Sequence, residues 1–90
     1  MAGRGKNIME TKIGVIDDFF AKINVVAIKL EGDISVGDTI HIKGHTTDIT
    51  LAVDSMQVEH QSVQSAKKGD SIGIKINERA RKDDIVYKVT

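Results

Sequence analysis

The chain of 90 residues is long enough for one domain with a modest core and leaves no room for a second. Its 13 isoleucines and 9 valines, against only 2 leucines, favour strands over helices, because branched side chains suit a pleated, half-buried surface. The absence of cysteine excludes disulfides, thiolate metal sites and a cysteine nucleophile, and a net charge of zero removes the simplest argument for a nucleic-acid or membrane binder.

No apolar run approaches the ~20 residues that a membrane-spanning helix needs, and the first ten residues lack the apolar centre of a secretory signal. We therefore expect a cytoplasmic protein that does not enter a membrane. Residues 1–8 are polar and glycine-rich and are expected to form a flexible tail. Residues 9–90 are expected to form a single β-barrel domain.

Short apolar segments with a period of two follow one another along this domain, and such alternation predicts half-buried strands. In the segment that begins at Asn24, the residues Val26, Ile28 and Leu30 share one face. In the segment that begins at Thr39, Ile40 and Ile42 do the same. The expected strands span residues 13–16, 24–30, 39–43, 48–54, 56–58, 72–76 and 85–89. About six or seven short strands separated by turns predict an all-β sandwich or barrel.

The expected turns and bends have their own signals. Gly-Asp pairs at residues 32–33, 37–38 and 69–70 predict tight corners, because glycine supplies a positive φ and aspartate caps the turn. Gly14 within an apolar segment predicts a bulge or a close backbone approach, and the charged pair Asp17–Asp18 is expected to start a connection. After Ser55 the apolar alternation slips by one residue, which predicts a bend.

No pattern of catalytic residues is present. The sequence lacks a P-loop and a G-x-S-x-G nucleophile elbow. The adjacent carboxylates Asp17–Asp18 and Asp83–Asp84 would point to opposite faces of a strand and so could not share one site. The histidines His41, His45 and His60 lack a metal-ligand spacing and are expected at the surface. We therefore predict no enzyme, no metal and no cofactor.

Basic residues gather in the turns near the C-terminus. Between residues 67 and 82 there are 6 basic and 2 acidic side chains. The candidate residues of this group are Lys67, Lys68, Arg79, Arg81 and Lys82. Arginine gives bidentate phosphate contacts and lysine a point charge. The group fits either an RNA-contacting edge or an ordinary solvated surface, and the sequence leaves both open.

Several strings, taken in order, resemble the second domain of translational GTPases, the β-barrel of elongation factor Tu and initiation factor two. The strings lie at residues 13–15, 30–42, 53–57, 66–74 and 84–86. The resemblance begins near residue 10 and implies a closed Greek-key barrel of about six strands. The sequence also resembles the small barrel that is appended to some collagenase-like peptidase-family proteins.

The first resemblance implies contact with the aminoacylated end of tRNA or with the ribosome. Asp54 matches the acidic residue of the family's terminal-adenosine pocket, Gln57 stands where the family has arginine, and Asp83 stands where the family has glycine. The family's GTPase domain is missing from this sequence, so GTP is not an expected ligand. The hypothesis is a non-catalytic, translation-associated module that contacts tRNA or ribosomal RNA through its loops. The alternative is a protein-interaction module that acts with a larger translation or RNA-modification enzyme. The residues assigned to RNA contact are Lys43, His45, Asp54, Gln57, Lys67, Lys68, Arg79, Arg81 and Lys82.

Overall fold

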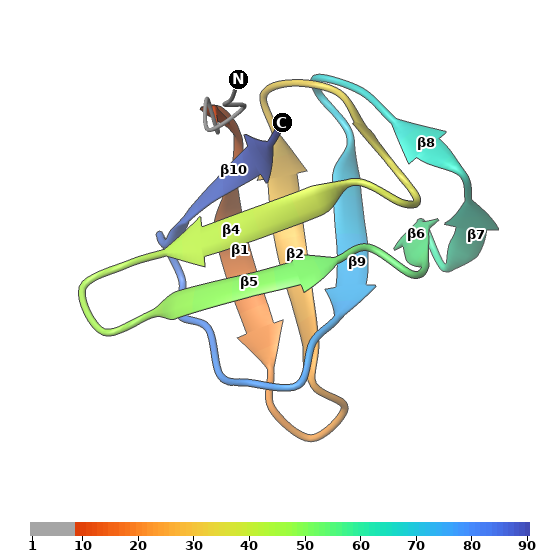
Figure 1. The fold of residues 1–90 in the computed structure, drawn as a ribbon. Coiled ribbons are helices and arrows are strands. Elements are labelled where there is room, and N and C mark those ends of the chain that lie inside the picture. Colours follow the sequence, from red (N-terminus) through yellow and green to blue (C-terminus); the bar gives the residue numbers. More distant parts are fainter. Residues whose placement is uncertain (1–8) are drawn as a thin grey trace.

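The computed structural model describes residues 9–90 and is all-β, as the composition predicted (Figure 1). The expected flexible tail at residues 1–8 lies outside the described residues, and the division of the chain into a tail and one domain stays a prediction. The strands are β1 (Glu10–Phe20), β2 (Val25–Leu30), β3 (Ile34–Ser35), β4 (Thr39–Lys43), β5 (Asp48–Ala52), β6 (Met56–Val58), β7 (Gln61–Val63), β8 (Ser65–Ala66), β9 (Ser71–Lys75) and β10 (Ile85–Val89). Within residues 9–90, no helix is long and apolar enough to cross a membrane.

Eight of the strands form one antiparallel sheet in the order β5-β4-β10-β1-β2-β9-β6-β7, and β3 pairs with β8 in a separate ribbon. The sheet curls into an open half-barrel, so the expected closed barrel of about six strands is wrong. Closure would require β5 to pair across the opening, but β5 pairs only with β4. At the other side of the opening, β6 meets β9 through the single pair Gln57 and Gly73. The curled sheet therefore keeps an open seam beside β5.

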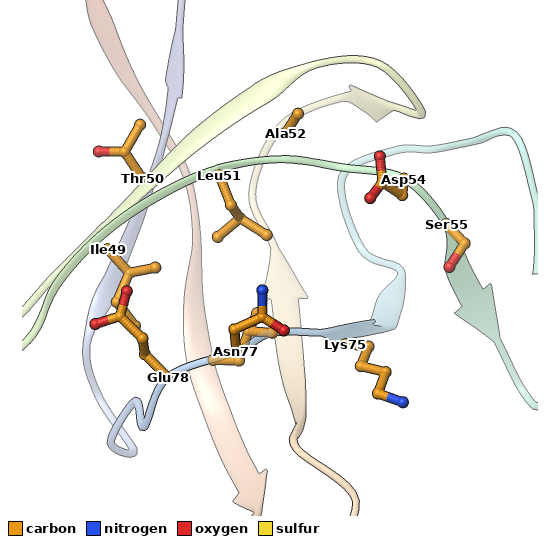
Figure 2. Close-up of a pocket in the computed structure, with 10 residues that line it drawn as sticks. Ile49, Thr50, Leu51, Ala52, Asp54, Ser55, Lys75, Asn77 and Glu78 are labelled. Atoms are coloured by element: carbon orange, nitrogen blue, oxygen red, sulfur yellow. The ribbon is translucent and has the colours of Figure 1, made fainter.

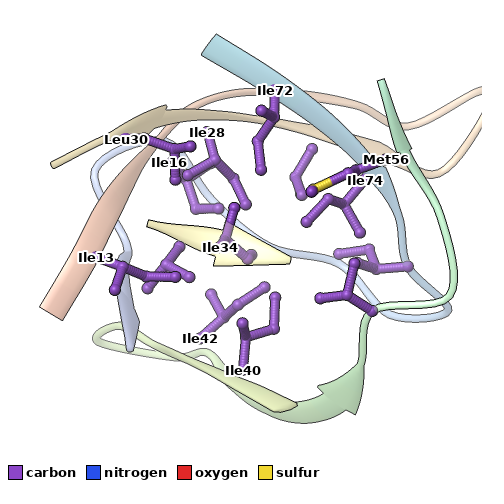
Figure 3. Packing of buried hydrophobic residues seen from close by; sticks show 14 of the residues in the cluster. Ile13, Ile16, Ile28, Leu30, Ile34, Ile40, Ile42, Met56, Ile72 and Ile74 are labelled. Carbon is purple, nitrogen blue, oxygen red and sulfur yellow. The ribbon is translucent and has the colours of Figure 1, made fainter. Parts of the chain in front are cut away.

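The core lies inside this curl and consists mainly of branched aliphatic side chains (Figure 3). Ile16, Ile28, Ile34 and Ile40 are fully buried there. The predicted alternation is confirmed, because Val26, Ile28 and Leu30 on β2 are all buried, and so are Ile40 and Ile42 on β4 and Ile72, Ile74 and Ile76 in and after β9. Burial of a side chain of this size contributes about 1.5–3 kcal/mol relative to leaving it exposed.

Strand β1 bends twice, which lets it pair with β10 at one end and β2 at the other. Its register shifts between Lys12 and Gly14 against β10, and again between Ile16 and Asp18 against β2. A Cβ at Gly14 would lie 2.8 Å from the Ile28 side chain, so the predicted bulge with close approach is confirmed. The expectation that Asp17–Asp18 starts a connection is wrong, because β1 continues to Phe20.

Three tight corners share one hydrogen-bonding pattern. In Ser35–Asp38, Lys67–Asp70 and Arg81–Asp84, the first residue's N–H donates to the last residue's carboxylate, over 2.8, 3.0 and 2.8 Å. In each corner the last residue's N–H also donates to the first residue's carbonyl. The third residue has a positive φ, which is 98° at Gly37, 96° at Gly69 and 75° at Asp83. Asp83 therefore keeps the conformation that glycine has in the other two corners. The expectation of a positive φ at Gly32 is wrong, because only Gly37 and Gly69 have one among the described glycines.

Candidate functional site

The open seam beside β5 exposes backbone hydrogen-bonding groups. The N–H and C=O groups of Val53 both face the turn between β3 and β4. The carbonyl accepts a hydrogen bond from Gly37 N, and the N–H donates to Asp38 O, each over 2.8 Å. Thr47, at the other end of β5, likewise exchanges both of its backbone hydrogen bonds with Gly44. Because these directions alternate along an antiparallel strand, the N–H and C=O groups of Thr50 and Ala52 face the seam. No described strand pairs with them there.

A cavity of about 410 Å³ adjoins this exposed edge. It lies between β5 and the segment that follows β9 (Figure 2). The side chains of Ile49 and Leu51 point from β5 toward the opposite wall, where Asn77 and Glu78 lie. The complete lining is Ile49, Thr50, Leu51, Ala52, Asp54, Ser55, Lys75, Ile76, Asn77 and Glu78. The cavity thus combines an aliphatic base with a polar rim directly beside unpaired backbone groups.

The rim of the cavity carries two carboxylates, Asp54 and Glu78, and one ammonium group, Lys75. All three residues are exposed, and none forms an ion pair with another residue in the described part of the chain. The rim therefore has a small excess of negative charge.

The structure disperses the residues that the sequence analysis assigned to RNA contact. Lys67–Lys68 and Arg79–Lys82 lie in the connections before and after β9, at opposite ends of this five-residue strand (Figure 1). A strand of that length spans about 17 Å. The basic residues near the C-terminus therefore do not form one continuous edge.

The remaining assigned residues lie in three places. Lys43 ends β4, and His45 lies in the hairpin between β4 and β5, which is next to the corner Arg81–Asp84 because Gly44 lies against Asp84. Asp54 follows β5 and is the one assigned residue that lines the cavity in the seam. Gln57 lies on β6, opposite Gly73. All nine assigned residues are exposed, so their side chains are accessible, but they do not meet in one site.

A second polar cluster lies on the outer face of the sheet and was missed by the sequence analysis. His41 Nδ1 lies 2.5 Å from Glu10 Oε2, and His41 Nε2 contacts Asp48 Oδ1. Lys43 donates to Glu10 over 3.3 Å and lies 5.5 Å from the centre of the Tyr87 ring. His41 is only partly accessible, so the expectation of three surface histidines is wrong for this residue, whereas His45 and His60 are exposed.

The two carboxylates favour the protonated imidazole, which donates from both ring nitrogens. The hydrogen bond with Glu10, and then that with Asp48, raises the pKa of His41 above its ordinary value of 6.5. The hydrogen bond from His41 lowers the pKa of Glu10 below its ordinary value of 4.5. The sequence signal was that His41, Lys43 and Asp48 alternate with apolar residues on β4 and β5, which predicts that they share the outer face of the sheet. Within residues 9–90, no three His, Cys, Asp or Glu side chains are arranged to hold a metal ion.

Comparison with known proteins places the chain beside peptidases. No protein-family model matches it. A protein from Methanocaldococcus jannaschii named an uncharacterized protease is 40% identical over 86 residues, which cover 94% of this chain and 21% of that protein. A collagenase from Porphyromonas gingivalis is 32% identical over 88 residues, which cover 96% of this chain and 24% of that protein. The chain thus spans about a fifth to a quarter of the length of these relatives.

Solved structures show the same fold. The C-terminal domain of a U32 peptidase from Geobacillus thermoleovorans matches with a TM-score of 0.81 and 11% identity, over 87% of this chain and 91% of that domain. A selenomethionine variant of that domain matches with a TM-score of 0.79 and 10% identity, over 83% of this chain and 95% of that one. At this level of identity the match shows the fold alone.

These findings correct three expectations. The resemblance to a translational GTPase barrel is wrong, because the relatives are named protease and collagenase and the structural neighbours are a U32 peptidase domain. The hypothesis of a translation-associated RNA-binding module is wrong for the same reason. The prediction that the protein has no enzymatic role is contradicted by the names of the relatives. The second resemblance, to the small barrel of collagenase-like peptidase-family proteins, agrees with the comparisons.

Proposed function

We propose that this chain is a domain of a U32 peptidase and that it binds the polypeptide on which the peptidase acts. The observation that carries the proposal is the 40% identity to a protein named a protease, over 94% of this chain but only 21% of that protein. A segment of this size within a much longer relative fits a domain that works beside others. The cytoplasmic location also stays a prediction.

The structure supports a polypeptide ligand. Polypeptides in extended form present alternating N–H and C=O groups, and the edge of β5 presents the complementary set at Thr50 and Ala52. The adjoining cavity of about 410 Å³ is large enough for side chains of such a ligand. The collagenase among the relatives is named for a polypeptide substrate. Heat-denatured collagen, whose separated chains are unfolded and accessible, is therefore the probe of choice.

The test uses the matched segment of the Porphyromonas gingivalis collagenase. That segment is deleted in one variant and replaced by the 90-residue chain in another, and cleavage of fluorescently labelled, heat-denatured collagen is measured. We expect the deletion to lose most of the cleavage rate and the replacement to recover it. The isolated chain should also retain heat-denatured collagen on a surface. A replacement that cleaves no faster than the deletion, together with no retention by the isolated chain, would refute the proposal.

A further inference from the structure

We infer that β5 binds its ligand by strand addition: an extended peptide pairs with the free edge of Asp48–Ala52 and prefers to carry a basic side chain. This inference rests on the proposed function and specifies its substrate class as extended peptide backbone. The contacts would come from the seam-facing N–H and C=O groups of Asp48, Thr50 and Ala52. Five residues of strand span about 17 Å, which sets the length of peptide that can pair at about five residues.

The edge of β5 lacks the features that usually protect an exposed strand. Natural sheets cover their edges or place lysine, proline or a bulge on them. The sequence of β5, Asp-Ile-Thr-Leu-Ala, contains no lysine or proline, and its pairing with β4 is regular over all five residues. Its one charged side chain, Asp48, is engaged by His41. The strand is therefore ready to accept another strand.

The opposite end of the sheet is a poorer site for strand addition. Strand β7 pairs only with β6 and contains three residues, Gln61–Val63, against five in β5. The ten-residue lining of the cavity in the seam includes four of the five β5 residues and none of β7. Among the end strands of the described sheet, β5 alone combines a longer edge with a cavity for side chains.

The lining of the cavity favours a basic side chain. In a peptide added to β5, alternate side chains point toward the inner face of the sheet, as Ile49 and Leu51 do. A lysine or arginine can lay its aliphatic stem over Leu51 and keep its charged end at the polar rim. That rim carries Asp54 and Glu78 against the single ammonium of Lys75. A glutamate at the same position of the peptide would meet a net negative rim.

The experiment uses labelled eight-residue peptides of threonine and valine with one central lysine, and fluorescence anisotropy with the 90-residue chain. N-methylation of alternate peptide residues removes backbone donors without touching the protein. We expect N-methylation in one alternating set to weaken binding about tenfold or more, and N-methylation in the other set to change it little, because only one set faces β5. Replacing the lysine by glutamate should weaken binding, and moderate salt should reduce that difference.

A protein variant gives a second readout. Ala52→Pro removes a donor that faces the seam and breaks no described hydrogen bond within the sheet, since proline is tolerated where the N–H of an edge strand faces solvent. The matched control is Ser62→Pro at the other end of the sheet, on β7. We expect Ala52→Pro to weaken peptide binding about tenfold and Ser62→Pro to leave it within about twofold. In the wild-type chain, the amide chemical-shift changes on peptide addition should be centred on Thr50.

Three results would overturn the inference. The first is an equal loss of binding with both N-methylated sets, and the second is amide shifts centred on β7. The third is sedimentation of the chain as a dimer that Ala52→Pro abolishes, because a second copy of the chain would then occupy the edge of β5. These results are distinguishable from failure of the proposed function. If heat-denatured collagen still binds and the chimeric collagenase is active while the N-methylation sets act alike, strand addition fails and the polypeptide-binding domain stands.

Discussion

Gly44 is the position where one added methyl group should most damage the fold. It follows β4 and exchanges two backbone hydrogen bonds with Thr47. A Cβ at this position would overlap three atoms of the Asp84 carboxyl group, Oδ1, Cγ and Oδ2. Asp84 is buried, and its Oδ2 accepts a hydrogen bond from Arg81 N over 2.8 Å. Gly44→Ala therefore displaces the Asp84 carboxylate, which then loses its hydrogen bond from Arg81 N.

The cost of Gly44→Ala follows from these contacts. Overpacking of a filled site costs about 1–3 kcal/mol, and loss of a hydrogen bond to a charged group about 1.5–3 kcal/mol. The lower entropy of the unfolded alanine chain returns about 0.4–1 kcal/mol. We expect a net loss of about 2–5 kcal/mol from a total of about 5–13 kcal/mol for a chain of this size. A loss of about 3 kcal/mol would lower Tm by about 12–24 °C.

Urea unfolding followed by circular dichroism measures this loss. Gly37→Ala is the matched control, because a Cβ there meets nothing within 4 Å and only the φ of 98° is strained, at a cost of about 1–2 kcal/mol. In a double-mutant cycle, Asp84→Ala removes the obstructing carboxylate, so the double variant should be no less stable than Asp84→Ala alone. A loss below about 1 kcal/mol for Gly44→Ala, or additive effects in the cycle, would refute the steric argument.

Three further predictions concern other parts of the molecule. His41→Gln should remove a pH dependence of the protein's stability. The stabilisation from the raised pKa of His41 is complete below pH 6.5 and is lost as pH rises through that raised value. The stabilisation from the lowered pKa of Glu10 is present above pH 4.5 and is lost as pH falls through that lowered value. The difference in Tm between wild type and His41→Gln should thus be largest between pH 4.5 and 6.5, and a constant difference from pH 3 to 9 would contradict it. Ile34→Ala should cost about 2–5 kcal/mol in urea unfolding because its side chain is fully buried, whereas Ile23→Ala, at 59% exposure, should cost less than about 1 kcal/mol; equal losses would show that the core is placed wrongly. Asp83→Gly should leave stability unchanged or raise it by up to about 1 kcal/mol, since glycine adopts the φ of 75° without strain, and a loss above 1 kcal/mol would show that the Asp83 side chain stabilises the corner.

The longer strands were predictable because their alternation records which side faces the core, whereas the short strands β3, β7 and β8 were not predicted. Val26, Ile28 and Leu30 repeat with a period of two, and all three are buried. Corners were predictable from the chemistry of turns, since Gly37 supplies a positive φ and Asp38 caps the same turn. Both signals are local, so neighbouring residues suffice to produce them.

The site was less predictable because it depends on pairing between distant strands. The contact of His41 with Glu10 joins residues 31 positions apart, through strands that flank β10. The basic residues near the C-terminus looked like one group in sequence, but β9 separates Lys67–Lys68 from Arg79–Lys82. The resemblance to translation factors misled for a related reason. Its strings include Gly-Asp corners, which the geometry of tight turns requires in many β-domains whatever their function.

The open seam is a consequence of how both ends of β5 are held. At one end, the hairpin at Gly44 lies against Asp84, whose carboxylate caps the corner before β10. At the other end, Val53 exchanges hydrogen bonds with Gly37 and Asp38. Beyond Val53 the chain leaves the strand, and β6 joins β9 on the far side of the cavity. Moving β5 across to pair with β9 would break the contacts at both ends, so the fold itself keeps this edge available to a separate strand.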